Sequence, residues 1–102
     1  MLAERLLAQL AQGQDGPLLR LGLAKSLLVS DPAAALEHAR AAAAQDPKLS
    51  AAWKLLGRAA ISAGEPETAR TAWTQGVAVA RQRGDLQAVR EMEVFLRRLS
   101  AD

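Results

Sequence analysis

The chain has 102 residues, no cysteine, a formal net charge of +2 at pH 7, and a composition that is 50% hydrophobic but only 3% aromatic. The length favours a single domain. The lack of cysteine excludes disulfides, thiolate nucleophiles and Cys-ligated metals. The near balance of positive and negative residues argues against a surface that follows nucleic-acid phosphates. Ala and Leu supply most of the hydrophobic residues, and because both favour helices we expect one all-α domain over residues 1–102.

Glycine and proline divide the chain into six predicted helices, with approximate ranges 2–12, 17–29, 32–45, 51–63, 66–83 and 85–99. Pro17 suits the first turn of the second helix, and Asp31 is placed to cap the third. Ser50 is a candidate cap for the fourth helix, while Gly84 and Asp85 would end the fifth and start the sixth. Because the loops are short, we expect consecutive helices to be antiparallel neighbours.

The first predicted helix, residues 2–12, interrupts its apolar residues with Glu4 and Arg5. A secretory signal needs a continuous apolar stretch, and a membrane span needs about 20 apolar residues. Neither pattern occurs in the sequence. We therefore expect a soluble, cytoplasmic protein that does not insert into a membrane.

The second and third predicted helices carry a leucine–glycine pair followed by regularly spaced alanines. Leu21 and Gly22 lie in the second helix, and Ala35, Ala39 and Ala42 follow in the third. Small residues on one face of a helix allow a neighbouring helix to approach closely. The two helices are therefore expected to form a tightly packed pair.

The fourth and fifth predicted helices repeat this arrangement 35 residues later, with Trp53-x2-Leu56-Gly57 in the fourth and Ala69-x3-Trp73 in the fifth. The two units together resemble the tetratricopeptide repeat (TPR) family, whose motif of about 34 residues contains Trp-x2-Leu-Gly-x2-Tyr followed by Ala-x3-Phe. The resemblance implies a TPR-like α-α superhelix. It also implies that both tryptophans belong to the core rather than to a site where a ligand stacks.

The resemblance divides the chain into an N-terminal capping helix in 1–14, a first repeat in 15–48, a second repeat in 49–83 and a C-terminal capping helix in 84–102. Two repeats are fewer than the roughly three that usually bury a continuous core, so the capping helices must belong to the fold. Lys25 stands where the first repeat would have an aromatic residue. An extra residue near Ser30 leaves the register of this helix open by one position.

The sixth predicted helix, residues 85–99, is amphipathic. Its apolar stripe covers about a third of the circumference and comprises Ala88, Val89, Met92, Phe95, Leu96 and Leu99. Leu86 and Val94 lie outside this stripe, and Glu93 and Arg97 are spaced to form an i,i+4 ion pair. We expect one face of the helix to be packed and the other to face solvent.

The sequence lacks the residue groups that catalysis or cofactor binding would need. General acid–base chemistry usually relies on histidine or on a carboxylate in a cleft, and His38, the only histidine, is expected to be an exposed surface residue. The serines mostly occupy helix ends, where capping explains them. Gly13-Gln-Asp-Gly16 lacks the Gly-Lys-Ser/Thr ending of a phosphate-binding loop. We expect a non-enzymatic protein with no cofactor, metal or small-molecule substrate.

In the TPR family, the first helix of each repeat lines a concave groove that receives a peptide or a partner helix. The resemblance implies that the groove residues here are Lys54, Arg58, Ile61 and Ser62 in the fourth helix and Leu19, Leu23 and Leu27 in the second. Lys54 matches a lysine with which some TPR domains bind a C-terminal carboxylate, whereas Leu55 stands where an asparagine would assist. Such a groove would suit a peptide with an acidic group and an apolar anchor. The competing interpretation is that the basic residues are only the solvated edge of a packed helix and that the leucines pack against the first helix.

These features lead to three hypotheses about function. The first is a protein–protein interaction module that acts as an adaptor, an assembly factor or a co-chaperone-like binder. The second is self-association into a homodimer through exposed apolar faces that include Leu86 and Val94. The third, which the charge balance disfavours, is nucleic-acid binding through Arg81, Arg83, Arg90, Arg97 and Arg98. The sequence leaves open whether the terminal helices of the chain itself occupy the groove.

Overall fold

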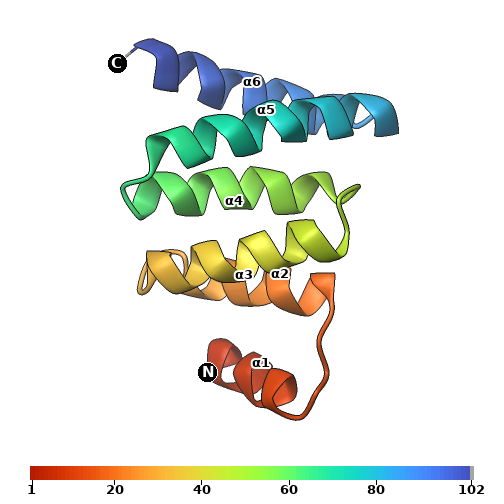
Figure 1. The fold of residues 1–102 in the computed structure, drawn as a ribbon, viewed down its shortest axis with the longest axis vertical. Helices are drawn as coiled ribbons and strands as arrows, with labels where there is room; N and C mark the ends of the chain where they lie inside the picture. Colours follow the sequence, from red (N-terminus) through yellow and green to blue (C-terminus); the bar gives the residue numbers. More distant parts are fainter. Residues whose placement is uncertain (102) are drawn as a thin grey trace.

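The computed structural model describes residues 1–101, and this part of the chain forms six α-helices joined by short loops. The helices are α1 (Leu2–Ala11), α2 (Pro17–Leu27), α3 (Pro32–Gln45), α4 (Ser50–Ser62), α5 (Pro66–Arg83) and α6 (Leu86–Ala101). They stack along the long axis of the molecule (Figure 1). The expected all-α class is confirmed, and each predicted helix end lies within two residues of the observed one.

Several predicted helix ends have the expected local geometry. The Asp31 carboxylate accepts a hydrogen bond from the Ala34 amide at 3.2 Å and caps α3. Gly84 follows α5 in the left-handed conformation, with φ of 73°. The Asp85 carboxylate accepts a hydrogen bond from the Ala88 amide at 3.2 Å at the start of α6. Local polar and glycine signals were sufficient to predict these ends.

One prediction about a helix end is wrong, and one helix is slightly shorter than its approximate predicted range. α2 ends at Leu27, two residues before residue 29, because the chain turns there and the Asp31 amide donates to the Leu27 carbonyl at 2.8 Å. Ser50 does not cap α4, since it is the buried first residue of that helix and its hydroxyl donates to the Asp85 carboxylate at 3.0 Å. That bond ties the start of α4 to the start of α6, which a local pattern does not reveal.

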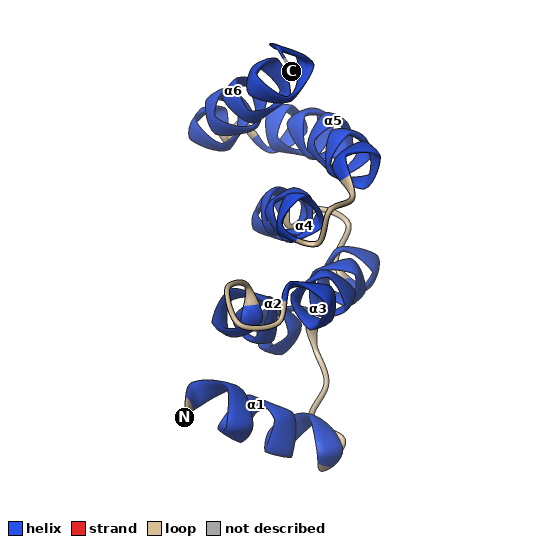
Figure 2. Ribbon diagram, turned by 90° about the vertical axis from the view of Figure 1, so that its left-hand side faces the viewer, coloured by secondary structure: helices blue, strands red, loops and turns tan. Residues whose placement is uncertain are grey.

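The helices are arranged in two rows (Figure 2). α2, α4 and α6 form one row, and α3 and α5 form the other. Consecutive helices from α2 to α6 pack against each other, and within the first row α4 contacts both α2 and α6. The first row therefore presents a continuous surface, which we call the α2/α4/α6 face.

Trp73 of α5 joins α4, α5 and α6. Its side chain is buried, its indole N–H donates to the Lys54 carbonyl at 3.1 Å, and its ring centroid lies 5.0 Å from that of Phe95. A Cβ added at Gly57 would overlap the indole. The glycine of the second leucine–glycine pair thus provides the space for Trp73, and the expected core position of this tryptophan is confirmed.

Trp53 is half-buried and lies toward α3 and α5, in a hollow that also includes Thr71. Its indole N–H donates to the Pro47 carbonyl at 2.8 Å. A Cβ added at Gly76 would meet both the Cβ of Trp53 and the sulfur of Met92, so this glycine lets α5 approach α4 and α6. Trp53 packs against the core as expected, but part of its side chain remains accessible to solvent.

The N-terminal helix α1 lies at one end of the stack and, among the described helices, packs only against α2. No residue of α1 is buried. Leu6 approaches α2 at Gly22, where an added Cβ would lie 3.2 Å from the Leu6 Cδ1 atom. Leu2 and Leu7 remain exposed. The contact that holds α1 is therefore narrow.

The C-terminal helix α6 packs through the predicted stripe. Ala88, Val89 and Met92 are buried, and Phe95, Leu96 and Leu99 pack against the core. Leu86 is exposed and Val94 is half-buried. The predicted ion pair of Glu93 with Arg97 is wrong, because Glu93 accepts a hydrogen bond from Arg81 of α5 at 2.7 Å. This ion pair therefore joins two helices instead of two turns of one helix.

Candidate partner-binding groove

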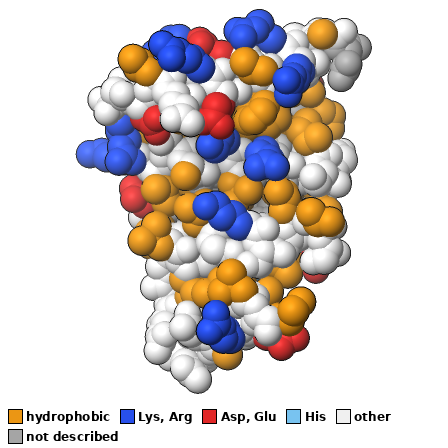
Figure 3. All heavy atoms as spheres, turned by 180° about the vertical axis from the view of Figure 1, so that it is seen from behind, with side chains coloured by type: hydrophobic (Ala, Val, Ile, Leu, Met, Phe, Trp, Pro, Cys, Tyr) orange, Lys and Arg blue, Asp and Glu red, His pale blue; other side chains and the backbone are white. Residues whose placement is uncertain are grey.

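The α2/α4/α6 face contains a hollow of about 450 Å³ at the junction of α2 and α4, which we call the cationic hollow. Its lining residues are Lys25, Leu28, Ala51, Lys54, Leu55 and Arg58. Figure 3 looks at this face and shows Lys and Arg side chains in blue among hydrophobic side chains in orange. The hollow thus combines three positive charges with an apolar floor.

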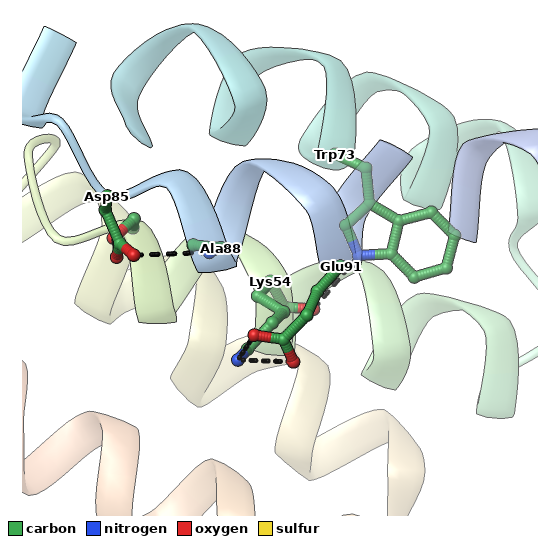
Figure 4. A network of polar contacts seen from close by, with 6 residues as sticks. Lys54, Trp73, Asp85, Ala88 and Glu91 are labelled. Atoms are coloured by element: carbon green, nitrogen blue, oxygen red, sulfur yellow. Dashed lines mark hydrogen bonds and ion pairs between the residues drawn. The ribbon is translucent and has the colours of Figure 1, made fainter. Parts of the chain in front are cut away.

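Lys54 is the one cation of this hollow that has an acidic partner within residues 1–101. Its Nζ lies 3.3 and 3.4 Å from the two carboxylate oxygens of Glu91 on α6 (Figure 4). Lys25 and Arg58 are exposed and form no ion pair with another described residue. Two positive charges are therefore left uncompensated, and they would attract a negative group of a partner.

A second hollow of about 220 Å³ is shared by α4, α5 and α6, and we call it the apolar hollow. Ile61, Trp73, Phe95 and Leu99 line it together with Arg98. Ile61 is 43% exposed, so apolar surface is open to solvent here. Because Ile61 follows Arg58 by about one turn of α4, the two hollows are neighbours on one helix.

The expected groove residues of α4 lie on this face or at its end. Lys54 and Arg58 line the cationic hollow, and Ile61 lines the apolar hollow. Ser62 is exposed at the end of α4 but lines neither hollow. Three of the four residues predicted in α4 are thus brought together.

The expected groove residues of α2 do not form a groove wall. Leu23 is 0% exposed and cannot contact a partner, so its prediction is wrong. Leu27 is half-buried and packs against the core, and Leu19 is half-buried near the loop that joins α1 to α2. The sequence leaves the register of this helix open by one position, and in the structure Lys25 of α2 and Leu28, the residue directly after α2, line the cationic hollow instead.

One of the missed residues carried a signal in the sequence. Burying a charged side chain without a partner is costly, so a lysine in a slot that is usually aromatic indicated that Lys25 faces solvent. Glu91 carried no such signal. It reaches Lys54 across 37 residues of sequence, and its role depends on how α6 is placed against α4.

His38 lines neither hollow, and the prediction that it is an exposed surface residue is wrong. It is half-buried, and its Nδ1 lies 3.1 Å from Nη1 of Arg20. Arg20 also donates to both carboxylate oxygens of Asp15, at 2.9 and 3.0 Å. Partial burial and the Arg20 charge lower the pKa of His38, and Arg20 holds the pKa of Asp15 well below its usual range. The network links the α1–α2 loop, α2 and α3.

The two hollows offer positive charge and apolar surface, and their linings contain no histidine, serine or carboxylate. In the part of the chain that the structure describes, no three His, Asp or Glu side chains are placed to hold a metal ion. None of the described helices is long and apolar enough to cross a membrane. The arrangement of the face is suited to binding an acidic and apolar surface.

Comparison with known proteins gives a consistent result. A family model described as tetratricopeptide repeat matches residues 27–92. A TPR repeat-containing protein of Pseudomonas aeruginosa is 51% identical over 100 residues, which cover 97% of this chain and 95% of that protein. The solution structure of a protein from Bordetella parapertussis is similar, with a TM-score of 0.83 and 48% sequence identity over 99% of this chain and 89% of that chain.

Proposed function

Because the chain belongs to the tetratricopeptide repeat family, we propose that it is a protein–protein interaction module whose α2/α4/α6 face binds a peptide or a helix of a partner protein. TPR repeats generally mediate interactions between proteins, and members of the family are typically not enzymes. An adaptor, an assembly factor or a co-chaperone-like binder would each use the face in this way.

The observation that carries the proposal is the pair of uncompensated cations, Lys25 and Arg58, beside an open apolar hollow. Exposed ion pairs contribute only up to about 1 kcal/mol each, so positive charge alone would give weak binding. The apolar hollow supplies surface from which a partner could displace water. The two features together support a binding face more strongly than either does alone.

The test is capture of partners from a cytoplasmic extract of the source cell on immobilised protein, followed by mass spectrometry. Lys25→Glu combined with Arg58→Glu reverses the two unpaired charges and is expected to abolish capture. Lys54 is left unchanged in this variant, because a glutamate there would face Glu91 and reduce stability.

The matched control is Arg90→Glu combined with Arg97→Glu. It makes the same change in net charge at two exposed residues of α6 that line neither hollow. The control is expected to keep capture, and both variants are expected to keep the thermal midpoint of the wild type within about 3 °C. Capture that survives reversal of Lys25 and Arg58 would contradict the proposal.

One observation favours self-association as a second candidate function. The N-terminal end of the stack exposes Leu2, Leu7 and Leu18, the last of them by 72%. A second copy that covered these leucines would strengthen the narrow attachment of α1. Analytical sedimentation at high micromolar protein concentration tests this candidate function. A monomer at that concentration would exclude self-association. A dimer that Leu7→Glu with Leu18→Glu dissociates would support it.

A further inference from the structure

We propose that the row of α3 and α5 carries a second binding site, which takes a free α-amino acid with a large apolar side chain. The site is the hollow of about 420 Å³ beside Trp53, which we call the Trp53 pocket. It opens between α3 and α5, on the other row of helices from the α2/α4/α6 face (Figure 2). The inference therefore does not depend on the proposed function.

The Trp53 pocket exists because α3 and α5 do not pack against each other. Each of them packs on α4, but within the described residues the backbones of α3 and α5 do not come close. Trp53 and Leu56 of α4 are left between them, with Arg40 on the α3 side. The α5 side is formed by Glu67, Thr68, Thr71 and Ala72. The volume of the pocket falls in the range of about 300–1,000 Å³ that is usual for small-ligand sites.

Trp53 offers the pocket a fixed apolar surface. Its indole N–H donates to the Pro47 carbonyl at 2.8 Å, and its Cβ lies against Gly76. The ring is therefore held in place, and its one hydrogen-bond donor is already used. Because the side chain is half-buried, the part that remains open can only pack or stack. A ligand meets this surface best with an apolar or aromatic side chain.

Two opposite charges line the pocket, and both are loosely paired. Arg40 lies 3.4 Å from Glu65, and Glu67 lies 3.5 Å from Arg70. Hydrogen bonds between ionised groups are usually about 2.7–2.9 Å long. Both Arg40 and Glu67 are also exposed, so their present ion pairs contribute little. A ligand carboxylate at Arg40 and a ligand ammonium at Glu67 would each give a better contact.

The charged groups and the indole lie toward different ends of the pocket. Arg40 contacts Glu65, two residues before Glu67, so both charges lie near the start of α5. Gly76, which meets the Cβ of Trp53, is nine residues after Glu67, or about 13 Å along the helix axis. An α-amino acid has the same arrangement. Its ammonium and carboxylate share one carbon, and its side chain points away from both.

This arrangement favours a free amino acid over a segment of a protein. The N-terminus of a chain supplies an ammonium without the carboxylate, and the C-terminus supplies a carboxylate without the ammonium. Either would leave Arg40 or Glu67 without a new partner. A simple anion would also meet the Glu67 carboxylate, which repels it. Only a zwitterion with an apolar side chain uses Arg40, Glu67 and Trp53 together.

The probes are phenylalanine and three analogues that each lack one of its groups. Phenylalanine amide has no carboxylate, N-acetylphenylalanine has no ammonium, and alanine has no ring. Binding is followed at low salt by NMR of the ¹⁵N-labelled protein, which has two tryptophans. The indole signal of Trp53 reports on the pocket. The indole signal of Trp73, which lines the apolar hollow, is the internal control.

Phenylalanine is expected to shift the Trp53 indole signal with a dissociation constant of about 1 mM and to leave the Trp73 signal in place. Each analogue should bind about fivefold more weakly. In Arg40→Gln, phenylalanine and its amide should bind equally, because both changes remove the same contact. In Glu67→Gln, phenylalanine and N-acetylphenylalanine should bind equally for the same reason.

The matched controls are Arg90→Gln and Glu4→Gln, which remove one charge of each sign at exposed residues outside the pocket. Both should keep the preference for phenylalanine over its analogues. An unmoved Trp53 signal at about 20 mM phenylalanine would overturn the inference. So would equal binding of phenylalanine and the analogues, or a preference that Arg40→Gln and Glu67→Gln leave intact. A shift of the Trp73 indole alone would place the ligand in the apolar hollow and overturn it as well.

Discussion

Gly57 has no side chain because Trp73 occupies the space in which one would lie. The indole cannot easily move away, since its N–H is held by the Lys54 carbonyl and its ring packs near Phe95. Overpacking of this kind typically costs about 1–3 kcal/mol. We therefore expect Gly57→Ala to lower the free energy of unfolding, measured by urea denaturation, by about 2 kcal/mol or more.

The control for this prediction is Gly16→Ala. No atom lies within 4 Å of a Cβ added at Gly16, and its φ of 172° is extended backbone that alanine adopts. The expected change in the free energy of unfolding is within about 1 kcal/mol. Equal effects of the two substitutions would contradict the role assigned to the glycine beside Trp73.

Glu91 competes with a ligand carboxylate for Lys54, because it already lies 3.3 Å from the Lys54 nitrogen. Glu91→Gln should therefore increase the affinity for the captured partner, by about twofold to fivefold. Since the ion pair is partly exposed, its loss should cost less than about 1 kcal/mol of stability. Glu93→Gln, which breaks the ion pair with Arg81, is the control and should leave the affinity unchanged. An unchanged affinity in Glu91→Gln would exclude this competition.

His38 should titrate below its ordinary pKa of 6.5, because partial burial and Arg20 disfavour its charged form more than Asp15 and Glu37 favour it. The unfolded chain then binds more protons than the folded one between the two pKa values. The free energy of unfolding should therefore fall as the pH drops below about 6.5, until the folded pKa is passed. NMR titration of the imidazole checks the sign. Arg20→Gln should raise the midpoint, and a wild-type midpoint above 6.5 would contradict the account.

At the scale of single residues, the sequence predicts the positions that follow from the register of the repeat motif. It does not predict the side-chain contacts between helices that are distant in the sequence. The positions of Lys54, Arg58 and Ile61 beside the two hollows were predictable because the register of α4 matches the TPR motif. Leu23 was misplaced because a shift of one residue rotates a helix face by about 100°. The contact of Glu91 with Lys54 joins helices that are distant in the sequence, so no local spacing encodes it.

At the scale of helices, the least firmly held element is α1. It contacts α2 alone among the described helices and has no buried residue, whereas α6 at the other end buries Ala88, Val89 and Met92. Segments with few buried contacts open locally at low free energy. Hydrogen exchange should therefore be at least about tenfold faster for the amides in the middle of α1 than for those of α6. Equal protection of the two terminal helices would show that α1 is held by more than its contact with Gly22.

Helix ends were predictable where the capping group lies within a few residues, as it does for Asp31 and Asp85. They were not predictable where a distant group intervenes. Ser50 has a residue type that suits a cap, yet its hydroxyl bonds to Asp85 of another segment. Short-range signals thus define most of the helices, and contacts between helices decide how the remaining polar side chains are used.

At the scale of the whole molecule, the stack measures 41 × 28 × 18 Å, and α4 is its central helix, in contact with α2, α3, α5 and α6. Both hollows open beside α4, so the candidate binding face is built on the helix with the most neighbours. Three of the five arginines named for the nucleic-acid hypothesis have other contacts or positions in the described structure. Arg81 pairs with Glu93, Arg83 donates to the Lys48 carbonyl, and Arg98 lines the apolar hollow.

The most direct test of the central claim is the footprint of a captured partner on the ¹⁵N-labelled protein, measured by NMR. The account predicts shifts of the Lys25, Arg58 and Ile61 amides and of the Trp73 indole, with the Trp53 indole unchanged. A footprint on α3 and α5 that moves the Trp53 indole, with the signals of the α2/α4/α6 face in place, would contradict it.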